Sequence, residues 1–275
     1  MDAEHRLLDA GRSLGAATVS RGAVARVTAG DLPGRDRALR VDQALAVEKV
    51  ATSAKALDVL VGPAGTGKTT ALAGLRAVWE AEHGTGSVVG LAPSAAAAEV
   101  LAAELGISTE NTAKWMFEHR QRAGRRAEIE RLLDNVRASK LSPGARRRVE
   151  QLRAELAQWT LRRDQLVIVD ESSMAGTFVL EELSTAAQDA GAKLLLVGDP
   201  CQLSAIEAGG MFAALVRDRG EVAELEGVHR FHNPWEKEAS LRLREGHEDV
   251  IDVYERHGRV VGGDQQDLIA QVYEA

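Results

Sequence analysis

The chain has 275 residues, of which 45% are hydrophobic and 27% are charged, and its formal net charge is −7. This composition is that of a globular protein with enough apolar residues for a sizeable core, and it excludes a protein that is basic throughout. The single cysteine, Cys201, excludes an intramolecular disulfide. We find no apolar run long enough for a membrane span and no secretory signal pattern, so we expect a cytoplasmic protein.

The first 40 residues predict a helical preface followed by a linker, because Gly30, Pro33 and Gly34 form a turn-rich stretch. From residue 41 onward apolar side chains recur at helical spacing. Val41, Leu45 and Val50 are expected on the buried face of that helix.

Short apolar strands then alternate with amphipathic helices. The expected strands are residues 58–61, 87–91, 166–169, 194–197 and 222–225, and the expected helices between them include 95–105 and 178–190. Alternation of this kind is typical of a parallel sheet with helices on both faces. We therefore predict one α/β domain over residues 41–232, followed by C-terminal helices over 233–275.

A basic segment interrupts the alternation. Residues 119–163 contain 13 Arg or Lys and 5 Asp or Glu, an excess of 8 positive charges. The segment predicts two amphipathic helices, and Ser142-Pro143-Gly144 supplies an N-cap and a proline at the start of the second. This is an inserted helical hairpin, and its arginines either follow a nucleic-acid backbone or form an ordinary solvated surface.

A phosphate-binding motif lies between the first strand and the helix after it. Residues 62–69 match G-x-x-x-x-G-K-[ST] in full. Glycines let the backbone N–H groups curl around phosphates, and the helix N-terminus adds partial positive charge. Lys68 is expected at the β- and γ-phosphates and Thr69 at Mg²⁺. The residues expected to bind the nucleotide are Gly62, Pro63, Ala64, Gly65, Thr66, Gly67, Lys68, Thr69 and Thr70.

Two acids complete this predicted site. Asp170 and Glu171 follow the apolar strand 166–169, whose carboxyl end should lie beside the phosphate loop. We expect Asp170 to hold Mg²⁺ and Glu171 to act as general base toward the attacking water. Taken alone, the pair reads equally as an acidic loop after a strand.

The order of these motifs resembles a known family. Gln43, residues 62–70, Leu91-Ala92-Pro93-Ser94, Val169 to Ser173, residues 197–203 and His229-Arg230-Phe231 resemble the first motor domain of superfamily 1 DNA helicases. Within them the chain looks most like the RecD-like branch and the helicase half of TraA/TrwC-type conjugative relaxases. The resemblance covers roughly residues 35–260 and implies a RecA-like fold, ATP, Mg²⁺, single-stranded DNA and 5′ to 3′ movement.

Further roles come from this resemblance. It implies that Gln43 reads adenine and that Gln202 and Arg230 contact the γ-phosphate. It also implies DNA contacts for Ser94, Thr112 and Trp115. Each has a plainer alternative: Gln43 as a polar helix position, Arg230 as a surface arginine, and Trp115 as a core residue.

The chain departs from the family in its length. A helicase motor needs two RecA-like domains, and the residues after Arg230 are too few for the second. We also find no metal-binding histidine triad of a relaxase. The expectation is therefore one motor domain of a longer parent protein that supplies a second motor domain and possibly a relaxase. A non-catalytic nucleotide- or DNA-binding fragment and a P-loop ATPase of another class remain the alternatives.

Overall fold

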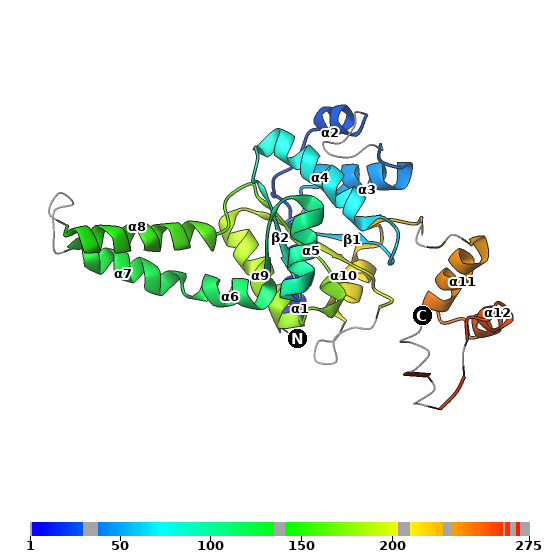
Figure 1. The fold of residues 1–275 in the computed structure, drawn as a ribbon. Helices are drawn as coiled ribbons and strands as arrows, with labels where there is room; N and C mark the ends of the chain where they lie inside the picture. Colours follow the sequence, from blue (N-terminus) through cyan, green and yellow to red (C-terminus); the bar gives the residue numbers. More distant parts are fainter. Residues whose placement is uncertain are drawn as a thin grey trace.

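The computed structural model describes residues 2–29, 38–134, 141–202, 210–227, 231, 233–260, 262–264 and 268–269. At its centre is a six-stranded parallel sheet with the strand order β3-β2-β4-β5-β1-β6 (Figure 1). The strands are β1 (Leu57–Val61), β2 (Val88–Ala92), β3 (Ser108–Asn111), β4 (Leu166–Val169), β5 (Lys193–Gly198) and β6 (Ala223–Glu224). The predicted α/β class with a parallel sheet is confirmed.

Twelve α-helices and one short 3₁₀ turn accompany the sheet within the described residues. The helices are α1 (Asp2–Arg12), α2 (Arg21–Thr28), α3 (Val41–Thr52), α4 (Lys68–His83), α5 (Ala95–Leu105), α6 (Thr112–Arg120), α7 (Arg122–Asp134), α8 (Pro143–Gln158), α9 (Thr177–Ala190), α10 (Met211–Arg219), α11 (Pro234–Arg244) and α12 (Val250–Arg256). The 3₁₀ turn is η2 (Ser172–Met174). None of the described helices has the length and apolar character to cross a membrane.

Both faces of the sheet are buried under helices. One core contains Leu7 of α1, Leu180 of α9 and Phe212 of α10, together with alternate residues of the strands. The other contains Trp79 of α4 and Leu101 of α5. Burial on both faces explains why β1, β4 and β5 are apolar along nearly their whole length.

The N-terminal residues form part of this core. Leu7 of α1 is fully buried on one face of the sheet, and Val24 of α2 is buried on the other. The segment predicted as a preface therefore contributes to both layers. The turn-rich stretch predicted around Gly30 to Gly34 lies outside the described residues.

Two sequence expectations need correction. Strand β3 was not predicted, because its residues, Ser108 to Asn111, are polar and lie at the edge of the sheet. The predicted buried face of α3 was partly wrong, since Val41 and Leu45 are 78% and 60% exposed. The buried face of α3 instead includes Gln43, which is only 1% exposed.

The predicted basic hairpin is present as α7 and α8, which extend away from the sheet (Figure 1). Ser142 caps α8 by accepting a hydrogen bond from the Ala145 N–H at 3.2 Å, as the Ser-Pro-Gly sequence predicted. Two ion pairs cross between the helices, Arg148 Nε to Glu128 at 2.8 Å and Arg125 Nε to Glu155 at 2.9 Å. Part of the basic charge therefore holds the two helices together.

Candidate phosphate-binding site

The predicted phosphate loop is a turn between β1 and α4. Its first residue, Gly62, extends the sheet by donating from N–H to the Gly198 carbonyl at 3.0 Å. Gly65 and Gly67 have φ angles of 82° and 80°, which side chains rarely tolerate. The Thr66 hydroxyl is buried and donates to the Pro63 carbonyl at 2.8 Å. The loop is thus fixed from within while its glycine backbone stays open.

The close packing of the loop requires its glycines. A β-carbon on Gly62 would lie 2.9 Å from Lys68 Cγ, and one on Gly67 would lie 2.6 Å from Gln43 Nε2. The space beside the backbone is therefore filled by side chains that serve the loop. This leaves the N–H groups at the start of α4 as the surface available to an anion.

Lys68 is the first residue of α4, and its ammonium lies at the acidic end of β4. Lys68 Nζ is 3.5 Å from Glu171 Oε1, and the two side chains are 15% and 32% exposed. A pair this long and partly solvated is a weak one, so a phosphate can compete for the lysine. The predicted meeting of the phosphate loop and the second acid is present in the structure.

The residues at the end of β4 have an unusual backbone. Glu171 has a φ of 50°, and its N–H donates to Asp170 Oδ1 at 2.9 Å. Burial raises the pKa of Asp170, while the Glu171 N–H and Lys68 lower it. A partly buried carboxylate of this kind gains from a nearby cation, which fits the Mg²⁺ role expected of Asp170.

Behind the two acids lies Ser172, for which no role is predicted from the sequence. Its hydroxyl donates to the Val169 carbonyl at 2.6 Å and accepts from the Val197 N–H at 3.0 Å. Ser172 is fully buried, so these bonds join the ends of β4 and β5 in a dry environment. A serine directly after the two acids that follow β4 was the available signal.

Thr69 lies beside Lys68 and contacts a further acid. Its hydroxyl donates to Glu104 Oε2 of α5 at 2.8 Å. Glu104 was not predicted, because nothing in the pattern of α5 distinguishes it from a solvated position. Hydroxyl and carboxylate oxygens are the ligand types that Mg²⁺ prefers, so Thr69 and Asp170 fit the ion expected with a nucleotide.

Gln43 supports the phosphate loop from behind. Its Oε1 accepts from the Arg40 N–H at 3.1 Å and its Nε2 donates to the Gly67 carbonyl at 3.2 Å. Arg40 Nη2 also donates to the Thr66 carbonyl at 2.7 Å. In this structure the amide of Gln43 is engaged by the protein's own backbone, so its contact with adenine stays a prediction.

The turn after β5 carries Gln202. The Gln202 N–H donates to the Asp199 carbonyl at 3.1 Å, and the Cys201 N–H donates to Asp199 Oδ1 at 3.0 Å. Gln202 lines a cavity of about 390 Å³ together with Pro63 and Ala64 of the phosphate loop. The structure therefore brings Gln202 to the phosphate loop, whereas Arg230 lies outside the described residues.

The three predicted DNA contacts are in different surroundings. Ser94 is exposed and caps α5 by accepting from the Ala97 N–H at 3.1 Å, and Thr112 is the first residue of α6. Trp115 is only 5% exposed and stacks on His119 with a centroid distance of 4.5 Å. This placement favours the core alternative for Trp115 over base stacking, because its ring offers almost no free surface.

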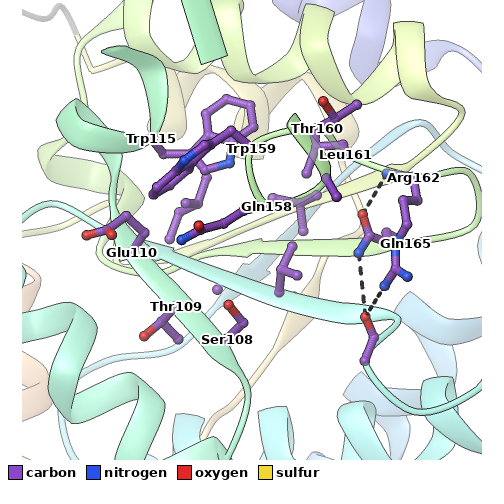
Figure 2. A pocket seen from close by; sticks show the side chains of 16 residues that line it. Ser108, Thr109, Glu110, Trp115, Gln158, Trp159, Thr160, Leu161, Arg162 and Gln165 are labelled. Carbon is purple, nitrogen blue, oxygen red and sulfur yellow. Dashed lines mark hydrogen bonds between the residues drawn. The ribbon is translucent and has the colours of Figure 1, made fainter. Parts of the chain in front are cut away.

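Trp115 also borders a cavity of about 330 Å³ (Figure 2). Its walls come from β2, β3 and the segment before β4, including Trp159 and Arg162. Arg162 Nη2 donates to the Gly86 carbonyl at 2.8 Å and closes one end. No residue of the phosphate loop lines this cavity, so it is separate from the phosphate site.

Comparison with known proteins gives relatives of two kinds. Conjugal transfer protein TraA of Agrobacterium fabrum is 34% identical over 230 residues, which is 83% of this chain and 17% of TraA. RecBCD enzyme subunit RecD of Mycolicibacterium smegmatis is 32% identical over 193 residues, 68% of this chain and 32% of that protein. The chain thus spans about a sixth of the TraA relatives it matches. The predicted resemblance to TraA and RecD proteins is confirmed.

Among solved structures, the UvsW helicase from bacteriophage T4 matches with a TM-score of 0.41 and 12% identity. The match covers 76% of this chain and 68% of that one. A family model described as an AAA domain matches residues 38–265, which include every described element of the phosphate site. The chain therefore belongs to the AAA domain family.

Proposed function

We propose that this chain is the ATP-hydrolysing first motor domain of a DNA helicase of the TraA or RecD type. The observation that carries the proposal is the meeting of Lys68 and Glu171, 3.5 Å apart, where the carboxyl ends of β1 and β4 face the N-terminus of α4. An ammonium, a weakly paired carboxylate and a helix N-terminus at one point suit phosphoryl transfer to water.

Each group has a role in that reaction. The loop N–H groups and Lys68 hold the phosphates, and Thr69 with Asp170 holds Mg²⁺, which when bound neutralises developing charge on the phosphate oxygens. When phosphate takes the ammonium, Glu171 is left free to orient water and accept its proton. Gln202 and Arg230 are assigned to the γ-phosphate, and Gln43 to the adenine.

The nucleic acid in this proposal is single-stranded DNA, along which the protein translocates in the 5′ to 3′ direction. Ser94 is the N-cap of α5 after β2, and the largely buried Thr112 is the first residue of α6 after β3. The N–H groups at the start of these two helices are suited to a DNA phosphate. The helical hairpin supplies additional arginines. The alignment covers 17% of TraA, which supports a longer parent protein. The second motor domain, a possible relaxase domain and a cytoplasmic location are part of the proposal.

Steady-state ATP hydrolysis with and without single-stranded DNA tests the proposal. We expect DNA-stimulated turnover, and we expect Glu171→Gln to abolish it while a fluorescent ATP analogue still binds. Glu130→Gln, which neutralises an exposed acid on α7, serves as the control. Nucleotide binding without any turnover would favour a non-catalytic module, and stimulation by duplex DNA alone would refute the helicase assignment.

A further inference from the structure

A second charged pair lies beside the phosphate site, and no role has been assigned to it. Arg244 of α11 reaches the Asp199 carboxylate with Nε 3.0 and 3.1 Å from its two oxygens and Nη2 2.8 Å from Oδ1. The Asp199 side chain is 4% exposed and that of Arg244 is 21% exposed. A forked, largely buried contact of this kind is among the stronger ion pairs in proteins.

The same Asp199 shapes the turn that carries Gln202. Its Oδ1 accepts both from Arg244 and from the Cys201 N–H, and its carbonyl accepts from the Gln202 N–H. Asp199 therefore has one oxygen fixed by α11 and by its own turn together. Without Arg244 the carboxylate would be buried beside the turn with no cation in place, and its geometry would relax.

Helix α11 packs chiefly against α12, and the two are set apart from the sheet (Figure 1). Trp235 of α11 stacks on His257 at a centroid distance of 3.7 Å, and Glu236 pairs with Arg259 at 3.2 Å. These contacts stay within the C-terminal segment. Among described residues, the Arg244–Asp199 pair is the ion pair that joins α11 to the sheet.

A cavity lies between this helix and the phosphate loop. Pro63, Ala64 and Gln202 line one side of the 390 Å³ space, and Leu241, Arg244 and Tyr254 line the other. The turn that begins at Asp199 and helix α11 therefore face each other across this cavity. A movement of the turn can be accommodated there and can be transmitted to α11 through Arg244.

We propose that Arg244 is a positioning residue for Gln202: by clamping Asp199 it sets the turn that presents the Gln202 amide to the γ-phosphate, and it couples that turn to α11. The inference rests on the proposed function, since it deepens the role of the same ATP site. It predicts that losing Arg244 impairs hydrolysis more than nucleotide binding.

Amide hydrogen exchange measures the clamp without any turnover. We expect Arg244→Gln to speed exchange in the peptide containing residues 199–202 by roughly tenfold or more, because a charge-assisted contact to a buried carboxylate is lost. Arg244→Lys keeps the charge but loses the fork, and should be intermediate. Arg242→Gln is the matched control, since Arg242 pairs with Asp249 on the same segment. Equal exchange in the Arg244 and Arg242 variants would overturn the clamp.

Kinetics test the link to Gln202. Arg244→Gln should lower kcat with a nearly unchanged KM for ATP, and it should add little to the loss already caused by Gln202→Ala. Fully additive losses, or an effect confined to KM, would overturn the positioning role. If Lys68→Ala leaves turnover unchanged, the ATPase assignment itself fails, whereas normal turnover in Arg244→Gln alone refutes only this inference.

Discussion

The two ends of the sheet both hold charged groups, but they use them differently. At the carboxyl end, Lys68 and Glu171 stand 3.5 Å apart and remain partly exposed. At the amino end, Asp58 is held between Lys193, at 2.7 Å, and Arg219, and all three side chains are at most 8% exposed. The first arrangement leaves its charges accessible to a ligand, whereas in the second the charged side chains are buried and paired with one another.

Most groups of the amino-end cluster have partners, although Arg219 Nε is buried without a hydrogen-bond acceptor. Lys193 Nζ donates to the Ser53 carbonyl at 2.5 Å and to the Lys55 carbonyl at 3.2 Å, and Arg219 Nη2 donates to the Gly11 carbonyl at 3.1 Å. Burial lowers the pKa of Lys193, and Asp58 opposes that shift. Charges buried among several partners hold the layers together, whereas the partly exposed Lys68–Glu171 pair leaves its charges accessible to a ligand.

The largest effect should come from Lys68→Ala at the carboxyl end. We expect ATP turnover to fall by at least about a hundredfold, because the lysine charge acts on the transferring phosphate, while the unfolding midpoint changes little. Lys49→Ala, on the surface beside Glu221, is the control for a lost lysine. A large loss of stability with unchanged turnover would reverse the comparison.

At the amino end, Asp58→Ala should lower stability strongly rather than impair ATP turnover directly. Leaving Lys193 and Arg219 buried without their carboxylate should cost about 3–5 kcal/mol of unfolding free energy, measured by urea titration. Asp218→Asn removes an exposed partner of Arg12 and should shift the midpoint only slightly. Equal destabilisation by the two variants would mean that burial of the cluster does not matter.

The hairpin shows the same contrast between paired and unpaired charges on the protein surface. Arg120 and Arg148 pair with glutamates, whereas exposed Arg146 and Arg147 have no carboxylate within ion-pair distance among the described residues. Replacing Arg146 and Arg147 by Gln should weaken single-stranded DNA binding and reduce the salt slope by about 1.4, at about 0.7 per phosphate contact.

The control for that experiment removes the same charge from the paired residues. Arg120→Gln with Arg148→Gln should change the slope much less, as measured by fluorescence anisotropy over a salt series. Identical slopes in both double variants would assign the effect to net charge rather than to the unpaired arginines.

The smallest expected effect belongs to Trp115→Phe. If Trp115 is a core residue, its replacement by the smaller Phe should lower the protein's unfolding free energy by about 1–2 kcal/mol and leave DNA affinity unchanged. If it stacks on a base instead, affinity should fall while stability holds. Parallel melting and DNA titrations separate the two roles.

Much of the carboxyl end could be predicted because its chemistry is local in sequence. Glycines, Lys68 and the acids after β4 each follow an apolar strand, and parallel strands bring such ends together. The partners Glu104, Arg244 and Asp58 could not be predicted, since each acts with a residue at least 35 positions away. Nothing local distinguishes them from solvated charges.

The fold was predictable to a similar extent and for the same reason. Strands buried on both faces can be recognised in the sequence as apolar runs, whereas the edge strand β3 is polar and cannot. In α3 the apolar side chains of Val41 and Leu45 led to a wrong prediction of the buried face. The buried face instead contains Gln43, which holds the phosphate loop. Its burial is explained by two backbone partners that periodicity cannot show.

The hairpin is attached to the α/β domain in a way that lets it vary independently of the sheet. Helices α7 and α8 pack mainly on each other, and α7 has no fully buried residue. The entropic penalty for lengthening an insertion grows only slowly with the number of residues added. An insertion of this kind can therefore change in length and charge without disturbing the sheet or the phosphate loop.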